Sequence, residues 1–270
     1  MIRTYLINKE ELADIQYKEE LFSPQRRQKI ESSKRQEDKD LSACAELLLI
    51  YGLSRAGRVE LPLNIEENER KKLQLPGSSW HFNLSHAKDY AVCTVADAPV
   101  GVDIESFRVR ELMSPERMLH PEEARLLAYI SNSNEKKKYF YECWVAKESY
   151  LKNLGIGLIV RPRDFLVREE RLVIRDEEYQ ARKGHHARSA VQVQDSAGSG
   201  DTTLSDNLSY LEPRYVHVFE PGEIRGTDWK FDAGYRVAVC SMDKDPDHTA
   251  RLIHAADINQ ALEEIGGKAE

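Results

Sequence analysis

The spacing of hydrophobic positions predicts two long helical stretches, each accompanied by short segments rich in strand-forming residues. The first stretch begins at Ser23-Pro24, which has the N-cap and first-position order of a helix start, and dominates to about Arg55. Apolar residues between positions 41 and 49 recur at helical spacing, and Gly57 supplies a stop signal. The opening segment Ile2–Ile7 is rich in β-formers, so we expect a strand before this helix.

Three strand-like segments follow the first helical stretch. They are Trp80–Leu84, Tyr90–Val95 and Val100–Glu105. The turn residues Asp97-Ala98-Pro99 separate the last two, which is typical of a β-hairpin. We therefore expect those two strands to pair with each other.

The second helical stretch extends from Pro121 to about Leu154 and is ended by Gly155 and Gly157. Short strand candidates follow at Asp164–Val167, Leu172–Arg175, Tyr215–Phe219 and Tyr235–Ser241, and a polar break then precedes a C-terminal helix. Residues 177–208 are polar and carry few large apolar side chains, so we expect an exposed, mobile insertion. Its adjacent His185 and His186 have no third ligand at metal spacing and are expected to face solvent.

Two short segments of similar sequence give information on the domain organisation. Ala91-Val92-Cys93-Thr94 and Ala238-Val239-Cys240-Ser241 both lie on predicted strands. Four residues can match by chance, but two related α+β halves would also fit the length and the strand-helix-strand order. On that interpretation the chain divides into an N-terminal half at 1–110, a C-terminal half at 111–245 and a helical tail at 246–270.

Composition narrows the class of protein. The 270 residues exceed the usual size of one domain, and 41% hydrophobic with 31% charged residues indicates a folded chain. The 39 Lys and Arg against 46 Asp and Glu give a net charge of −7, which argues against a nucleic-acid binder that works through bulk positive charge. No segment approaches the roughly 20 apolar residues of a membrane helix.

The N-terminal segment and the cysteine spacing indicate the cellular compartment of the protein. The N-terminal segment becomes polar at Lys9 and has neither the apolar core nor the cleavage site of a signal peptide, so we expect a cytoplasmic protein. The cysteines form no Cys-x-x-Cys pair, which indicates neither a zinc ribbon nor a disulfide framework. We expect buried thiols at all four positions, Cys44, Cys93, Cys143 and Cys240.

The segment Gly101-Val102-Asp103-Ile104-Glu105 is the first candidate for chemistry. Side chains alternate across a strand, so Asp103 and Glu105 project from one face while Val102 and Ile104 anchor the other. Two adjacent carboxylates repel each other, and a hard divalent cation such as Mg²⁺ would relieve that repulsion. The alternative is a solvated acidic strand end, which is common.

A second candidate lies on the second helical stretch. Trp144, Glu148 and Lys152 are four residues apart and share one helix face, with Lys147 beside it. Glu148 is thus bracketed by ammonium groups, an arrangement that can add an acidic metal ligand and hold phosphate oxygens. The alternative is an exposed Glu-to-Lys pair, which gives no reason for the neighbouring aromatic residues.

A third candidate is Ser85-His86, which comes just after a predicted strand, where side chains and backbone N–H groups are available to an anion. In the expected hairpin, His86 would lie near the Glu105 end, although a register shift of one residue reverses the faces. Capping of a turn is the alternative role for this pair.

Taken in order, Phe82-Asn83-Leu84-Ser85-His86, Gly101-Val102-Asp103-Ile104-Glu105 and Trp144-x-x-Lys147-Glu148-Ser149-x-x-Lys152 resemble the motifs of the surfactin-type (Sfp-like) 4′-phosphopantetheinyl transferases. The resemblance implies an α+β monomer of two similar halves related by a pseudo-twofold, with coenzyme A bound in the cleft between them. It also implies an activity, which is transfer of the phosphopantetheine arm of coenzyme A to a serine of an apo acyl or peptidyl carrier protein, with release of adenosine 3′,5′-bisphosphate.

The resemblance implies roles for individual residues. Asp103, Glu105 and Glu148 match the acidic residues that bind Mg²⁺, with the cation bridging to the pyrophosphate. The proton of the incoming serine passes either to Glu148 or to a water polarised by Glu105 and the metal. The residues expected to contact coenzyme A are Arg26, Lys29, Lys71, Ser85, His86, Lys147 and Lys152, of which Arg26 and Lys29 resemble the grip on the 3′-phosphate.

Two departures from the family pattern concern the nucleotide end of the ligand. Asp40 stands near the start of the long helix, where the family often has a basic residue. Arg70-Lys71-Lys72 stands where the family often has Gly-Lys-Pro. Two other functions remain open on the residues: a Mg²⁺-dependent phosphohydrolase acting on a small phosphoester, and a non-catalytic homologue that binds carrier proteins.

Overall fold

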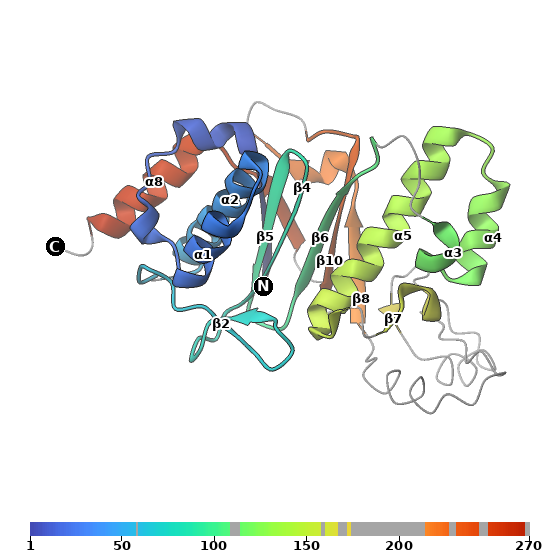
Figure 1. The fold of residues 1–270 in the computed structure, drawn as a ribbon, viewed down its shortest axis with the longest axis horizontal. Helices are drawn as coiled ribbons and strands as arrows, with labels where there is room; N and C mark the ends of the chain where they lie inside the picture. Colours follow the sequence, from blue (N-terminus) through green and yellow to red (C-terminus); the bar gives the residue numbers. More distant parts are fainter. Residues whose placement is uncertain are drawn as a thin grey trace. The chain divides into compact units, whose positions relative to one another are not determined.

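A computed structural model describes residues 1–57, 59–108, 114–157, 160–166, 172–173, 214–226, 231–242 and 248–267. The expected insertion at 177–208, with His185 and His186, lies outside the described residues. The chain forms two compact units. Figure 1 shows the chain coloured from the N-terminus to the C-terminus. Unit 1 comprises Met1–Val100, Glu220–Ala233 and Pro246–Glu270, and unit 2 comprises Gly101–Phe219 and Gly234–Asp245.

Unit 1 is built on a five-stranded sheet of order β4-β5-β1-β11-β9. Strand β5 is antiparallel to both β4 and β1, whereas β1 and β9 both run parallel to β11. The strands are β1 (Ile2–Asn8), β4 (His81–Ala87), β5 (Tyr90–Ala96), β9 (Ile224–Arg225) and β11 (His248–Leu252). A separate two-stranded ribbon pairs β2 (Glu66–Glu67) with β3 (Leu73–Gln74).

The helices of unit 1 are α1 (Pro24–Ser32), α2 (Gln36–Ala56) and α8 (Ala255–Gly266). Helix α1 starts as expected, with Ser23 as N-cap and proline in the first turn, and α2 stops before Gly57. Every residue from Leu41 to Leu53 is buried, because α2 packs on the sheet and is covered by α1 and α8. The centre of α2 is therefore the core of unit 1.

Unit 2 places one long helix against an antiparallel sheet of order β6-β10-β8-β7. The strands are β6 (Gly101–Ser106), β7 (Leu172–Val173), β8 (Arg214–Phe219) and β10 (Tyr235–Ser241). The helices are α3 (Pro115–Met118), α4 (Pro121–Tyr129) and α5 (Ser133–Leu154). Helix α5 packs on β6, β10 and β8, and Gly155 ends it in the left-handed conformation.

The remaining regular segments are short. Four 3-10 helices are described, at Lys9–Asp14, Glu19–Leu21, Pro162–Asp164 and Pro221–Glu223. Among the described residues, no helix combines the length and the apolar character needed to span a bilayer. The sheets and helices together confirm the expected α+β class.

The predicted hairpin between residues 90 and 105 is wrong. Strand β5 pairs with β4 and β1, whereas β6 belongs to the other sheet and pairs with β10. The turn residue Asp97 is used elsewhere: its carboxylate accepts hydrogen bonds at 2.7 Å from the Met1 ammonium, so it stays beside β1. His86 lies on β4 and Glu105 on β6, which belong to different sheets, so this hairpin does not bring the two residues together.

Three other sequence expectations differ from the structure. The helix expected over Pro121–Leu154 is two helices, because Asn132 caps the start of α5 by accepting from the N–H groups of Asn134 and Glu135. In the range Asp164–Val167, where a strand was expected, Asp164 is the last residue of a 3-10 helix, Phe165 forms an isolated bridge, and Val167 lies outside the described residues. The units also interleave in sequence: β6 and β10 both lie in unit 2, and α8 lies in unit 1, so a linear division at residue 110 separates partners.

Candidate active site

The site is organised by a close approach between β6 and α5. A Cβ atom built on Gly101 would lie 2.1 Å from the Ser149 carbonyl oxygen and 2.4 Å from the Asn153 nitrogen. Both atoms belong to the helix backbone, so a side chain here cannot be accommodated without moving the helix. Glycine at the first position of β6 thus allows the acidic strand and the basic helix to meet.

Asp103 is held directly by Lys152. The ammonium of Lys152 on α5 donates a 2.6 Å hydrogen bond to Asp103 Oδ1, and the Asp103 side chain is only 5% exposed. The structure therefore brings together one expected metal ligand and one expected phosphate contact. The alternative for Asp103 was a solvated acidic strand end. The structure shows instead a buried carboxylate with the charged partner that burial requires.

Glu105, two residues along the same strand, meets the aromatic side of α5. The indole Nε1 of Trp144 donates to Glu105 Oε1 at 3.3 Å. Burial raises the pKa of Glu105 to about 7, and the Asp103 charge adds to the rise, while the Trp144 hydrogen bond and Lys152 oppose it. This explains the aromatic residue in the helix motif, since it orients a partly buried carboxylate.

Glu148 completes the acidic group from the helix. It is half-buried, and burial together with the Asp103 charge raises its pKa, while Lys152 lowers it. Glu148 also raises the pKa of Glu105. The three carboxylates therefore interact electrostatically, as the two motifs together predict.

The donor chemistry of this group fits a hard divalent cation, because Mg²⁺ prefers carboxylate oxygens and a cation would relieve the mutual repulsion. Within the part of the chain that the structure describes, however, no three His, Cys, Asp or Glu side chains form a group able to hold a metal ion. The Lys152 ammonium supplies the positive charge beside Asp103 instead. The carboxylates are thus of the right type, and their side chains would have to reorient to share one ion.

Lys147, which was expected to contact phosphate, is turned into the interior in this structure. Its side chain is 0% exposed, and its ammonium forms an ion pair of 3.0 Å with Glu123 Oε2. It also donates to the carbonyl oxygens of Pro162 and Phe165. On a helix that packs against a sheet, the residue before Glu148 faces a different side and enters the protein interior.

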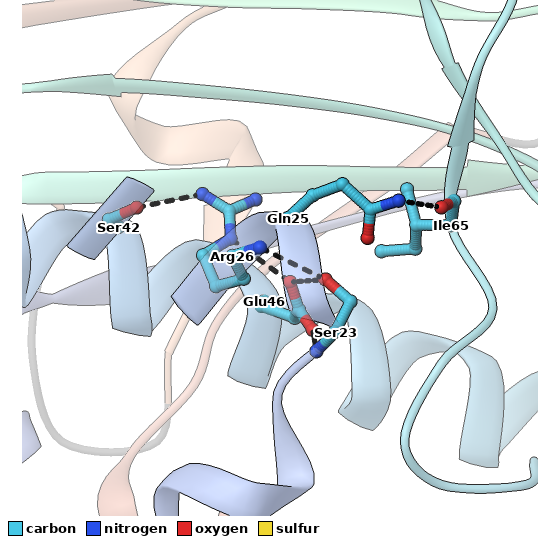
Figure 2. Close-up of polar contacts among 6 residues, drawn as sticks. All are labelled: Ser23, Gln25, Arg26, Ser42, Glu46 and Ile65. Atoms are coloured by element: carbon cyan, nitrogen blue, oxygen red, sulfur yellow. Dashed lines mark hydrogen bonds and ion pairs between the residues drawn. The ribbon is translucent and has the colours of Figure 1, made fainter. Parts of the chain in front are cut away.

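Arg26, expected to grip a phosphate, is likewise turned inward. Figure 2 shows its guanidinium between Glu46 and Ser42, with Nε 3.0 Å from Glu46 Oε2 and Nη1 2.9 Å from Ser42 Oγ. Glu46 is fully buried and also accepts from the N–H and hydroxyl groups of Ser23. In this conformation Arg26 joins α1 to α2 and is not a surface cation.

The other expected ligand contacts of unit 1 lie on three separate elements. Lys29 is exposed on α1, and Lys71 is exposed in the β2–β3 turn, where its φ is 60°. Ser85 is buried and His86 exposed near the end of β4, so the two side chains alternate across the strand. The sequence predicted Ser85 and His86 just after a strand, but both residues lie within β4.

Two carboxylates that matter to this architecture were not singled out in the sequence. Glu46 interrupts the apolar run of α2, and an ionisable residue amid buried positions is a signal of a paired charge. Glu123 follows a proline in the first turn of α4, and its side chain accepts from the His120 backbone N–H, which resembles a capping box. Neither pattern reveals the partner, Arg26 or Lys147, because the contacts are tertiary.

Comparison with known proteins places these residues in a family context. Residues 99–200 match the family model of the 4′-phosphopantetheinyl transferase superfamily. A 4′-phosphopantetheinyl transferase of Bacillus subtilis is 29% identical over 153 residues, or 54% of this chain and 66% of the relative. The Sfp transferase of Bacillus subtilis (strain 168) is 26% identical over 227 residues, covering 83% and 84%.

A third relative is the gsp 4′-phosphopantetheinyl transferase of Aneurinibacillus migulanus, 33% identical over 87 residues, or 32% of this chain and 36% of that protein. The matched part of this chain thus covers about a third of the length of gsp and just under two thirds of the length of the Bacillus subtilis transferase. It covers most of the length of Sfp. The matched region of the family model begins just before β6 and includes all of α5.

Proposed function

The chain belongs to the 4′-phosphopantetheinyl transferase superfamily, and we propose on that premise that it transfers the phosphopantetheine arm of coenzyme A to a serine of an apo carrier protein. The reaction breaks the pyrophosphate bond of coenzyme A and releases adenosine 3′,5′-bisphosphate. The observation that carries the proposal is the group formed by Asp103, Glu105, Glu148 and Lys152, which combines three interacting carboxylates with one ammonium.

In this proposal Asp103, Glu105 and Glu148 are the residues that would hold Mg²⁺. Bound Mg²⁺ would offset the charge of the pyrophosphate and stabilise the negative charge that develops on the leaving group. Lys152 then leaves Asp103 and pairs with a phosphate oxygen, for which its half-buried ammonium is suited. Trp144 keeps Glu105 directed toward the same space through its indole N–H.

The nucleophile arrives on the partner, so this chain needs only to accept its proton. We assign that role to Glu148, because Asp103 is buried and Glu105 already accepts from Trp144, whereas Glu148 is only half-buried. In the metal-free protein, burial and the Asp103 charge raise the Glu148 pKa, while Lys152 lowers it. A water activated beside Glu105 is the alternative acceptor.

The proposal assigns the remaining cations and polar groups to other parts of coenzyme A. Lys29 contacts the 3′-phosphate, Lys71 the nucleotide end, and Ser85 with His86 the pyrophosphate. Lys29, Lys71 and His86 are supported by their exposure, and Ser85 by its place beside His86. Arg26 and Lys147 are omitted, because their charged groups are engaged inside the protein.

We also propose that the two units arose by duplication and are related by a pseudo-twofold. The similar segments on β5 and β10 support this, since each strand lies between two antiparallel neighbours and packs against the long helix of its own unit.

We propose separately that the protein is a monomer and works in the cytoplasm. Free cysteines, of which Cys44, Cys93 and Cys240 are buried, support a reducing compartment.

The decisive experiment incubates the protein with coenzyme A, Mg²⁺ and several unrelated apo carrier proteins, and measures each carrier by mass spectrometry. We expect a gain of the phosphopantetheine mass on the carrier serine, absent with EDTA and with Asp103→Asn. A carrier whose serine is replaced by alanine is the control. No mass gain on any carrier would overturn the proposal, and release of phosphate without a carrier would favour a phosphohydrolase.

A further inference from the structure

Lys147 occupies a closed site inside unit 2 that uses every donor of its ammonium. Its side chain is 0% exposed, and three acceptors surround Nζ: Glu123 Oε2 at 3.0 Å, the Pro162 carbonyl at 2.8 Å and the Phe165 carbonyl. Nζ also lies 4.5 Å from the centre of the Phe165 ring. An ammonium has three N–H bonds, so this lysine is fully satisfied within the protein.

Glu123 connects this site to a second element. The same oxygen, Oε2, accepts the backbone N–H of His120 at 2.9 Å, which caps the start of α4. One carboxylate thus ties the start of α4 to the middle of α5, and through Lys147 to residues 162–165. Both partners are buried, which restricts them to one geometry more tightly than a surface pair.

The position of Lys147 fixes the rotation of α5 about its own axis. Successive residues of a helix are about 100° apart, so a lysine anchored in the interior determines the direction of Glu148, the next residue. Trp144 and Lys152 lie four residues before and after Glu148 and contact Glu105 and Asp103 on β6. A small rotation of α5 would move all three side chains away from the strand together.

We propose that Glu123 is a positioning residue: it anchors Lys147 and thereby sets the rotation of α5 that directs Glu148 toward Asp103 and Glu105. On this proposal Lys147 connects Glu123 of α4 to α5 and does not contact phosphate. The inference rests on the proposed function in that Glu148 is taken as a metal ligand. Neither Glu123 nor α4 contributes a ligand itself, so the effect on metal binding is transmitted through the helix.

The test compares Glu123→Gln, Lys147→Met and the double variant Glu123→Leu/Lys147→Met with the wild-type protein. The double variant replaces a buried ion pair by apolar side chains of similar size, a change that many proteins tolerate. Glu122→Gln removes a carboxylate from the same helix turn that is not an acceptor of Lys147, and Lys136→Met removes a lysine from α5; these are the matched controls.

Mn²⁺ affinity is measured by electron paramagnetic resonance, and folding by circular dichroism and thermal unfolding. Loss of a residue that orients a metal ligand weakens metal binding by about 10- to 100-fold. We expect a shift of this size in folded Glu123→Gln and in the double variant, with unchanged affinity in both controls. The Michaelis constant for coenzyme A at saturating Mn²⁺ should change much less.

Unchanged Mn²⁺ affinity in folded Glu123→Gln and in the double variant overturns the inference. So does a raised Michaelis constant for coenzyme A in Lys147→Met that Glu123→Gln does not share, since it would mark Lys147 as a phosphate contact. If Glu123→Gln does not fold, the double variant decides. Absence of Mn²⁺ binding by the wild-type protein overturns the metal site and this inference, whereas absent transfer with intact binding overturns only the proposed reaction.

Discussion

Lys152 Nζ lies 2.6 Å from Asp103 Oδ1, which joins a helix to a strand across 49 residues of sequence. The pair is asymmetric in exposure, because the Asp103 side chain is 5% exposed and that of Lys152 29%. The carboxylate is thus fixed in the interior, and the ammonium can exchange it for a ligand that approaches from solvent. This relationship makes Lys152 both an internal counter-charge and a candidate phosphate contact.

Lys152→Met should therefore weaken the activity in two ways. It removes a charge-assisted hydrogen bond, for which we expect kcat/KM for coenzyme A to fall by about 10- to 100-fold. It also removes the charge that lowers the pKa of Glu105 and of Glu148, so the acid limb of the pH–rate profile should move to higher pH. Lys136→Met is the control, and an unshifted acid limb would contradict the assignment.

Gly101→Ala should destabilise unit 2 without changing any charge. The new Cβ would approach backbone atoms of Ser149 and Asn153 at 2.1 and 2.4 Å, and backbone yields less readily than a side chain. We expect a loss of about 1–3 kcal/mol in the free energy of unfolding, measured by urea denaturation. Gly222→Ala is the matched control, since nothing lies within 4 Å of the position that its new methyl group would occupy. Equal stability of the two variants would contradict the close approach.

Glu46→Gln should strongly destabilise unit 1, because it leaves the buried Arg26 guanidinium without its counter-charge. Breaking a buried ion pair in this way costs about 3–5 kcal/mol in the free energy of unfolding. The double variant Arg26→Met/Glu46→Leu should recover most of that loss. The comparison is Glu37→Gln, which breaks the exposed Arg35–Glu37 pair and should change stability by less than about 1 kcal/mol.

The metal-free protein should lose stability as the pH rises from about 4.5 to about 7 through Glu105. Its pKa is raised from 4.5 in the unfolded chain to about 7 in the fold, so the folded state binds more protons in this window and ionisation favours unfolding. Thermal unfolding in EDTA across this range measures the effect. Glu105→Gln should flatten the slope, and added Mg²⁺ should restore stability above pH 7. A slope that is identical in the variant would contradict the raised pKa.

The sequence by itself determined the local features of this protein. The helix start at Ser23 follows from side-chain capping, and the helix stop at Gly57 follows from the low helix propensity of glycine; both effects act over a few residues. The acidic pair Asp103 and Glu105 and the helix face of Glu148 follow from the two repeat periods of strand and helix. These patterns also carried the resemblance to the transferase family.

Only the tertiary structure decided which of the charged residues pair with one another inside the protein. The family resemblance assigned Arg26 to phosphate, and the helix motif did the same for Lys147. In the structure each meets a buried carboxylate, Glu46 or Glu123, from a separate helix. Strand pairing was likewise predicted wrongly from the sequence, because β6 pairs with β10 from much later in the chain and not with its neighbour β5. The physical reason is common to both: burial makes a charge or an unpaired strand edge costly, and the partner that removes this cost is set by packing at long range.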